Sequence, residues 1–279
     1  MLEKRQIVRA RRGDDDDDCC QSITETGRNM SRFSGKKAAV SGGTHGMGFA
    51  IAKALLDGGA DVLMTGRNER NIDAARRALP GAHVVRTDTA NLSDIAALRS
   101  VIEDKLGAID FLFINAGVSV LGPLESVTEG MYDHMFDINT KGAYFTTQRL
   151  APLIRAGGAI VFTTLAEGPA TANLSVYAGS KAAVRAFAQV FAAELVVKGI
   201  RVNAVGPGFI DTPTLGVAGL TPEARAEMAK LGDQVTPMKR HGTPDEIARA
   251  ALFLAADATF TTGIELAVDG GLMQIGVAL

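Results

Sequence analysis

The chain has 279 residues, of which 47% are hydrophobic and 22% charged, and its 29 basic and 31 acidic residues leave a formal net charge of −2. This balance offers no basic excess for a nucleic-acid backbone, and no apolar run approaches the roughly 18 residues of a membrane-spanning helix. We therefore expect neither nucleic-acid nor membrane partners. Frequent glycine, at 31 residues, and few aromatic residues, at 5%, favour a tightly turned α/β fold.

The two cysteines, Cys19 and Cys20, are adjacent and precede the expected domain. A disulfide framework and a cysteine-ligated metal are therefore excluded from that domain, and the four histidines are scattered without metal-ligand spacing. Charges interrupt the N-terminus throughout, unlike a secretory signal. We expect a cytoplasmic, reducing environment and no metal.

Residues 1–34 have the composition of a charged tail. Basic residues in the first dozen positions precede five consecutive acids, Asp14–Asp18, and such blocks repel themselves out of compact structure. The sequence predicts a disordered tail at 1–34 and one domain at 35–279; a charge-mediated contact of the tail is the alternative. Met30 is a second candidate for the start of the protein, which the sequence leaves open.

From Lys36 onward, short apolar segments alternate with helical stretches. We expect strands at Lys37–Ser41, Asp61–Thr65, His83–Arg86, Ile109–Asn115, Ala159–Thr163, Arg201–Val205 and Glu265–Val268. Helices are expected at Met47–Asp57, Arg70–Leu79, Ser93–Leu106, Met131–Ile154, Ser175–Val197 and, after a long loop, Pro244–Ala256. This alternation predicts a single doubly wound, Rossmann-type α/β domain with about seven parallel strands and helices on both faces.

A glycine-rich turn, Ser41–Gly48, joins the first expected strand to the first helix. Gly42, Gly46 and Gly48 permit positive φ and a close approach of the backbone to a phosphate, and the following helix N-terminus favours an anion. A strand before the turn and a helix after it are the context of a dinucleotide site, with plain turn glycines as the alternative. The turn residues expected to bind the cofactor are Gly42, Thr44, His45, Gly46, Met47 and Gly48.

The second expected strand ends at Thr65-Gly66-Arg67. Dinucleotide sites that prefer NAD usually carry an acid here to hold the ribose hydroxyls. Arg67 can instead clamp a 2′-phosphate in bidentate fashion, which favours NADP over NAD. A surface arginine at a helix start is the alternative, and Asp61 lies at the wrong end of the strand to hold the ribose.

Tyr177 and Lys181 stand four residues apart on an expected helix, so they share one face. Tyrosine near its free pKa of about 10 is a poor acid–base at neutral pH. A cation about 4 Å away stabilises the phenolate by roughly 4 kcal/mol at intermediate dielectric. The pair indicates a tyrosine general acid–base, although this spacing alone is common by chance.

Further motifs accompany these in a fixed order, and together they resemble the short-chain dehydrogenase/reductase superfamily in its compact single-domain branch. The added motifs are Asn115-Ala116-Gly117, Asn139, Asn203, Pro207-Gly208, the segment from Pro237 to Ala248 and the segment from Gly263 to Gly271. The resemblance covers about Phe33 to Leu279. It implies reversible hydride transfer between NADP(H) and a small-molecule carbonyl or secondary alcohol, by a homotetramer.

The resemblance also implies residue roles, and its catalytic set is Asn139, Thr164, Tyr177 and Lys181. Tyr177 is the general acid–base, Lys181 holds the nicotinamide ribose and lowers the pKa of Tyr177, and Asn139 anchors a relay water. Implied cofactor contacts beyond the glycine turn and Arg67 are Asp88 at the adenine edge, Thr89, Asn115, Ala116, Gly117, Tyr177, Lys181, Pro207, Gly208, Ile210 and Thr212. A buried, backbone-bonded Asn139 and a merely polar strand-end Asp88 are the alternatives.

One position departs from the family pattern, which usually has a serine thirteen residues before the tyrosine. Thr164 stands there, and threonine keeps the hydroxyl but has a stiffer χ1; Ser175 and Ser180 lie at the wrong offsets. Thr164 either takes the serine role or merely ends a strand. Glu167 replaces the usual small residue near the substrate, where it repels an anion, binds a polar group or is simply solvated.

The rival functions are a catalytically idle nucleotide sensor on the same fold and a sugar-nucleotide epimerase of the extended branch. The intact Tyr177–Lys181 pair argues against the first, and the short chain against the second. The substrate stays open. The expected lid, Phe209–Val235, carries apolar residues that indicate an apolar pocket, although ordinary lid packing explains them equally well; they are Leu215, Val217, Leu220, Met228 and Leu231.

Overall fold

The computed structural model describes residues 32–168, 170–215, 217 and 221–275. The tail expected at 1–34, including Met30, lies outside this part of the chain except for its last three residues. None of the helices in the described part is long and apolar enough to cross a membrane.

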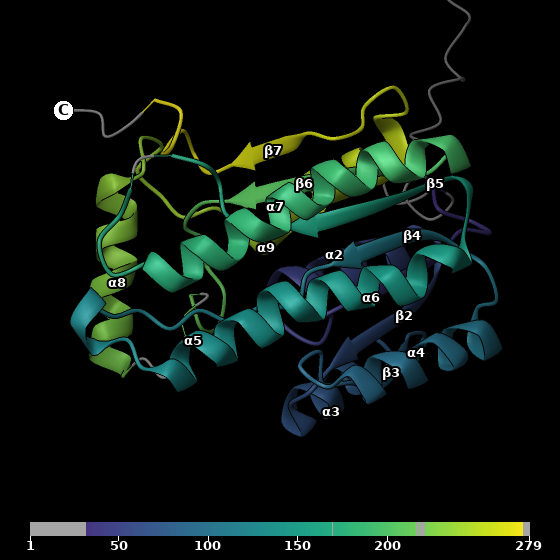
Figure 1. Cartoon of the computed structure of the whole chain (residues 1–279), viewed down its shortest axis with the longest axis horizontal. Helices are drawn as coiled ribbons and strands as arrows, with labels where there is room; N and C mark the ends of the chain where they lie inside the picture. The colour runs from purple at the N-terminus through teal and green to yellow at the C-terminus, as the bar shows by residue number, and fades with distance from the viewer. Residues whose placement is uncertain (1–31, 169, 216, 218–220, 276–279) are drawn as a thin grey trace, which may run out of the picture.

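Seven parallel strands form one sheet in the order β3-β2-β1-β4-β5-β6-β7 (Figure 1). They are β1 (Lys37–Ser41), β2 (Asp61–Gly66), β3 (His83–Arg86), β4 (Ile109–Ile114), β5 (Ile154–Thr163), β6 (Arg201–Pro207) and β7 (Glu265–Val268). The chain runs from β1 outward to β3, then crosses to β4 on the other side of β1 and continues outward to β7. The predicted doubly wound fold is confirmed, and its switch point lies between β1 and β4, where such sheets bind ligands.

Helices cover both faces of this sheet (Figure 1). One face carries α2 (Gly46–Asp57), α3 (Glu69–Ala78) and α9 (Pro244–Leu252); the other carries α4 (Leu92–Lys105), α6 (Ala143–Leu150) and α7 (Ser175–Leu195). Successive strand residues serve opposite cores, so Val40 of β1 packs with α2 and Ala39 with the other layer. β4 is buried along its whole length, as its continuous apolar run predicts.

The helix expected over Met131–Ile154 is observed at residues 129–150, with a π-helical turn inside it and an earlier end. α5 (Glu129–Phe136) leads into a π-helical turn (Asp137–Gly142) before α6, and a 3₁₀ turn (Ala151–Leu153) follows. Pro152 explains the stop at Leu150, because proline lacks the N–H that the helix needs and clashes with the preceding turn. β5 therefore begins at Ile154, earlier than the expected Ala159, and pairs irregularly with the start of β4.

The long loop expected before the last helix contains a helix of its own, α8 (Pro222–Val235). Thr221 caps it by accepting a hydrogen bond from the Ala224 N–H at 3.2 Å, and Pro222 fits the first turn because it needs no N–H partner there. α8 lies beyond the carboxyl ends of the strands, outside the two helical layers (Figure 1). Leu220 of the expected lid lies outside the described residues.

The folded contacts begin before the predicted boundary at residue 35. Phe33 is only 3% exposed, packs edge-on against Phe111 of β4 at 6.4 Å between ring centroids, and donates its backbone N–H to the Gly58 carbonyl at 2.7 Å. A Cβ on Gly58 would lie 2.4 Å from the Phe33 ring. Phe33 therefore belongs to the core and not to the tail.

We expect Phe33→Ala to lower the free energy of unfolding by about 3 kcal/mol, because it empties a buried site of an aromatic ring. Phe260→Ala is the matched control, since Phe260 is fully exposed at 106% and its removal should change stability by less than about 0.5 kcal/mol. Urea unfolding of the full chain measures both. Equal midpoints for the two variants would show that Phe33 lies outside the cooperative fold.

Candidate active site

The glycine turn presses tightly against the end of β4. Gly42 has a φ of 64°, and a Cβ there would lie 2.7 Å from the Ala116 Cα. A Cβ on Gly48 would lie 2.2 Å from the Gly42 carbonyl oxygen, so the first turn of α2 closes directly over the loop. His45 caps α2 without a side-chain hydrogen bond, and partial burial lowers the pKa of its imidazole. The backbone N–H groups at this helix start form a ready anion site.

Asn115, directly after β4, connects the glycine turn to the end of β5. Its Nδ2 donates to the Gly42 carbonyl at 3.0 Å, and its Oδ1 accepts from Thr163 Oγ1 at 3.2 Å. Ser41 Oγ accepts from the Ala116 N–H at 3.3 Å, which adds a second tie between the ends of β1 and β4. The sequence motif Asn115-Ala116-Gly117 thus braces the switch point of the sheet.

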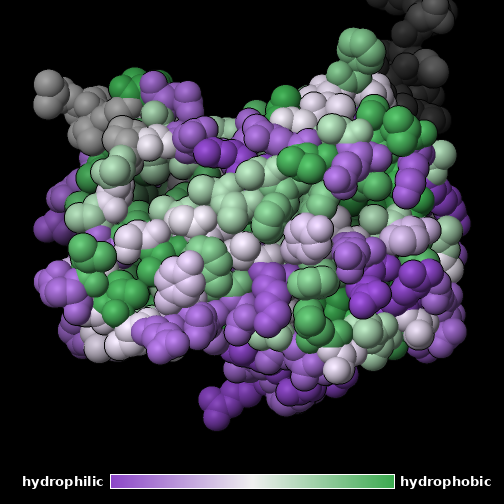
Figure 2. Space-filling view, in the orientation of Figure 1, coloured by the Kyte–Doolittle hydropathy of each residue, from purple (hydrophilic) through white to green (hydrophobic). Residues whose placement is uncertain are grey.

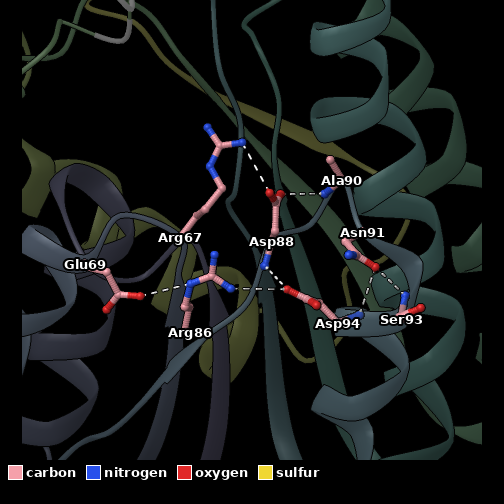
Figure 3. Close-up of polar contacts among 8 residues, drawn as sticks. All are labelled: Arg67, Glu69, Arg86, Asp88, Ala90, Asn91, Ser93 and Asp94. Atoms are coloured by element: carbon pink, nitrogen blue, oxygen red, sulfur yellow. Dashed lines mark hydrogen bonds and ion pairs between the residues drawn. The ribbon is translucent and has the colours of Figure 1, made fainter.

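Arg67 and Asp88 meet at the ends of β2 and β3 (Figure 3). Arg67 Nη1 lies 3.5 Å from Asp88 Oδ2, and the Arg67 side chain is 48% exposed. Asp88 is held in turn, because its Oδ1 accepts from the Ala90 N–H and its own N–H donates to Asp94 Oδ2 at 2.9 Å. The two residues assigned to the adenosine end of a cofactor therefore share one edge of the sheet.

Arg86 is a second cation at this edge that the sequence analysis did not select. Its Nε contacts Glu69 Oε1 at 3.0 Å, and its Nη1 lies 4.0 Å from Asp94 (Figure 3). Gly66 lets the glycine turn pack against the end of β2, since a Cβ on Gly66 would lie 2.2 Å from Thr44 Oγ1 of that turn. Asp61 pairs with His83 at the opposite end of β2, which confirms that it cannot reach this edge.

Tyr177 and Lys181 project from the first turns of α7 into one cavity of about 830 Å³. Lys181 is 5% exposed, and its Nζ donates to the Thr163 carbonyl at 2.8 Å. Gly117 keeps room for it, because a Cβ there would lie 3.1 Å from Lys181 Nζ. The other expected site residues that line this cavity are Met47, Asn115, Gly117, Thr164, Pro207, Gly208, Ile210 and Thr212.

Burial governs the protonation of this pair. Desolvation of the phenol raises the pKa of Tyr177 to about 12, and desolvation of the ammonium lowers the pKa of Lys181 to about 8. The net pKa of Tyr177 therefore lies above its free value, so any lowering by Lys181 is smaller than the effect of burial. The cost of burying the phenolate outweighs the attraction of a cation that donates to the Thr163 carbonyl.

Asn139 lies behind Lys181 in the π-helical turn and is 1% exposed. Its Oδ1 accepts from the Val118 N–H and its Nδ2 donates to the Val118 carbonyl, both at 2.8 Å; Nδ2 also lies 3.0 Å from Ser180 Oγ. The side-chain amide thereby clamps the loop after β4 to α7. Gly142 of the same turn packs against Thr89, and a Cβ on Gly142 would lie 2.5 Å from the Thr89 carbonyl oxygen. Thr89 therefore supports the turn from outside the cavity.

Thr164 follows β5 and is 2% exposed. Its hydroxyl lies 2.6 Å from Glu265 Oε2 and 3.0 Å from the Val205 carbonyl, and it has one proton to share between these acceptors. Glu265, at the start of β7, was missed by the sequence analysis because no local motif marks it. Parallel pairing of β6 with β7 brings it beside Thr164 across 101 positions of the chain.

Thr212 has a buried hydroxyl without a hydrogen-bond partner. It is 7% exposed and lines the cavity. A buried, unsatisfied hydroxyl is costly, and of the three such threonines in the described residues, Thr65, Thr146 and Thr212, only Thr212 lines this cavity. Together with the glycine cradle and the helix N-terminus, Thr212 fits a dinucleotide whose nicotinamide end lies in the cavity.

Glu167 does not line this cavity. Its Oε2 lies 2.5 Å from Nη1 of Arg185 on α7, and its side chain is 69% exposed. It is therefore a solvated, ion-paired loop acid, one of the readings that the sequence allowed. Within the described part of the chain, no group of three or more His, Cys, Asp or Glu side chains could hold a metal ion.

Comparisons with known proteins agree with this geometry. A family model described as enoyl-(acyl carrier protein) reductase matches residues 42–273. An oxidoreductase named asL5 from Sarocladium schorii is 38% identical over 252 residues, covering 88% of this chain and 99% of that protein. L-fucose dehydrogenase from Oryctolagus cuniculus is 35% identical over 245 residues, covering 86% of each. A short-chain dehydrogenase from Burkholderia cenocepacia, solved in complex with NADP, matches with a TM-score of 0.76 and 29% identity over 86% of this chain and 98% of that one.

The fold and these matches define a nicotinamide-dependent oxidoreductase. The chain belongs to the short-chain dehydrogenase/reductase superfamily, as its motifs predicted, and it is an oxidoreductase of that family.

We expect Thr212→Val to weaken NADPH binding about five- to tenfold, because it removes a neutral hydrogen bond to the cofactor. The stability of the protein without cofactor should stay the same or rise, since an unsatisfied hydroxyl leaves the interior. Thr146→Val is the matched control, because Thr146 Oγ1 is also buried and unpartnered but lies outside the cavity. Fluorescence titration with NADPH and thermal unfolding measure both, and unchanged NADPH affinity in Thr212→Val would contradict the assignment.

Proposed function

We propose that the protein transfers a hydride reversibly between NADP(H) and a carbonyl compound or secondary alcohol, with Tyr177 as the general acid–base. One observation carries this proposal. Tyr177 and Lys181 enter the same cavity as Asn115 and Gly117, which stand at the switch point beside the glycine turn. Reactive residues and the cradle for a dinucleotide thus meet at one place.

In the reductive direction, NADPH held by the glycine turn would supply the hydride for the carbonyl carbon. Tyr177 gives its phenolic proton to the carbonyl oxygen and recovers one from solvent, so carbonyl, NADPH and a proton become alcohol and NADP⁺. Its raised pKa of about 12 keeps Tyr177 protonated at neutral pH, as a proton donor requires. Lys181, with a pKa of about 8, is mostly charged at neutral pH and loses that charge as the pH rises through 8.

The remaining members of the proposed catalytic set act around this pair. Asn139 positions Val118 and Ser180, and because its side-chain amide is engaged, a relay water would use its backbone carbonyl. Thr164 stands in the family's serine position, and a χ1 rotation would move its hydroxyl from Glu265 to the substrate oxygen.

NADP is the proposed cofactor because Arg67 is half exposed at the end of β2. A guanidinium there can exchange its single contact with Asp88 for a bidentate clamp on a 2′-phosphate. We also propose a cytoplasmic homotetramer, supported by the family resemblance and by a domain without cysteine.

Tyr177→Phe should lower NADPH-dependent reduction of a reactive ketone by about 10²–10⁴-fold, the usual loss on removing a general acid, while NADPH affinity changes less than about twofold. Tyr132→Phe is the matched control, since Tyr132 is 46% exposed on α5 and lies outside the cavity. Steady-state kinetics decide. Turnover within tenfold of the wild type would reject Tyr177, and NADPH binding without turnover of any carbonyl by the wild type would favour an idle sensor.

Arg67→Ser should weaken NADPH binding by about 2 kcal/mol, the magnitude of a charge-assisted hydrogen bond, because the clamp is lost and Asp88 then faces the phosphate unpaired. NADH lacks the 2′-phosphate, so its affinity in the same variant is the internal control and should hold within about twofold. Calorimetric titration with both cofactors measures the difference. A wild-type preference for NADH would overturn the assignment of NADP.

A further inference from the structure

The cavity that holds Tyr177 and Lys181 extends well beyond them. Four separate segments wall its outer part: the loop after β4, the loop after β5, α8 with the residues before it, and the turn after β7. Representative wall residues are Leu121, Leu174, Leu215, Met228, Leu231 and Met273. Because these segments come from distant parts of the chain, the apolar lining is a property of the assembled site and not of one hydrophobic stretch.

Ionic groups are nearly absent from this wall. Lys181 is the only charged residue that lines the cavity in the described part of the chain, and its Nζ donates to the Thr163 carbonyl. Neighbouring charges are directed into pairs elsewhere. Arg225 of α8 lies 3.5 Å from Asp211 and donates to the Thr212 carbonyl, while Glu167 is paired with Arg185. A cationic substrate would therefore enter without a counter-charge, and an anionic one would meet only the Lys181 ammonium at the reactive end.

Polar side chains are concentrated at the reactive end. Farther out, the polar lining consists of Ser119, Thr171 and Asn173. A sugar or polyol carries a hydroxyl on almost every carbon, and each hydroxyl buried without a partner is penalised. An alkyl or ring system has no such requirement and gains from leaving water.

α8 supports the same conclusion from its exposure. Leu231 is 52% exposed although it lines the cavity, and Met228 on the same helix is partly exposed. In Figure 2, hydrophobic residues lie among hydrophilic ones at the end of the molecule where α8 lies, and further hydrophobic patches lie elsewhere on the same face. Apolar side chains left open on a cavity wall mark a surface that a ligand covers.

We propose that the substrate is an uncharged carbonyl compound, or its secondary alcohol, and not a polyhydroxylated sugar. Its apolar chain or ring lies against the part of the cavity wall that α8 forms with Met228 and Leu231, here called the α8 wall. This rests on the hydride transfer proposed above and adds the substrate class to it. It also separates this chain from the relative named L-fucose dehydrogenase.

The test uses the full chain with NADPH and a series of 2-ketones from 2-butanone to 2-decanone. kcat/KM should rise about three- to fourfold for each added methylene until the wall is covered, the gain expected for burying one CH₂. D-fructose as a ketose, and L-fucose with NADP⁺ in the oxidative direction, should react at least 100-fold less efficiently than 2-octanone.

Two variants locate the effect on α8. Met228→Gln should raise the KM for 2-decanone about tenfold and flatten the dependence on chain length, because it places a polar amide on the wall. Met238→Gln is the matched control, since Met238 is 66% exposed and lies outside the cavity; its kinetics should match the wild type.

The outcomes separate this inference from the proposed function. Reduction of ketones without dependence on chain length, or a sugar that reacts as well as 2-octanone, would overturn the apolar substrate while leaving hydride transfer intact. The absence of turnover with every ketone and sugar would overturn both. A chain-length dependence that is the same in Met228→Gln would remove the α8 wall from the proposal.

Discussion

The geometry of the site depends on the two hydrogen bonds of the Asn115 carboxamide. The carboxamide reaches the Gly42 carbonyl on one side and the Thr163 hydroxyl on the other, so it ties the cradle after β1 to the strand whose end meets Lys181. This connection works only because Gly48 has no side chain: a Cβ there would lie 2.5 Å from Asn115 Nδ2. The switch point of the sheet opens a crevice in any doubly wound fold, and here one amide sets the spacing of its two sides.

Desolvation then determines the chemistry at that crevice. Burial raises the pKa of Tyr177 and lowers the pKa of Lys181. The phenol therefore stays protonated, and the ammonium loses its proton more easily. Asn139 shares the same enclosed region, and its amide is satisfied by the Val118 backbone and Ser180. A polar network that is fully satisfied at low dielectric is rigid, so Asn139 and Ser180 fix the loop after β4 against the helix that carries Tyr177 and Lys181.

The proposed catalytic residues and the proposed substrate wall occupy different layers of the molecule. The proposed catalytic residues stand on the sheet edge and on α7, which belongs to one of the two main cores. The outer wall comes from loops and from α8, whose one fully buried residue is Gly232 and whose link to the preceding loop includes Arg225. Substitutions on α8 can therefore alter substrate choice with little cost to the core, the usual division between a rigid scaffold and its loops.

Local signals were enough to predict much of this protein. Alternating apolar and helical segments placed β1, β3 and β7 at their observed bounds, and glycine spacing located the turn, because these features depend on short-range sterics and periodicity. Pro152 was an available signal for the end of α6 that the continuous helix overlooked. Only the tertiary structure brought Glu265 to Thr164, paired Arg67 with Asp88 and buried Tyr177 so that its pKa lies above the free value. Strand order brings together residues that are far apart in the chain, and burial sets the local dielectric. Neither can be predicted from a short stretch of sequence, because both depend on how the whole chain packs.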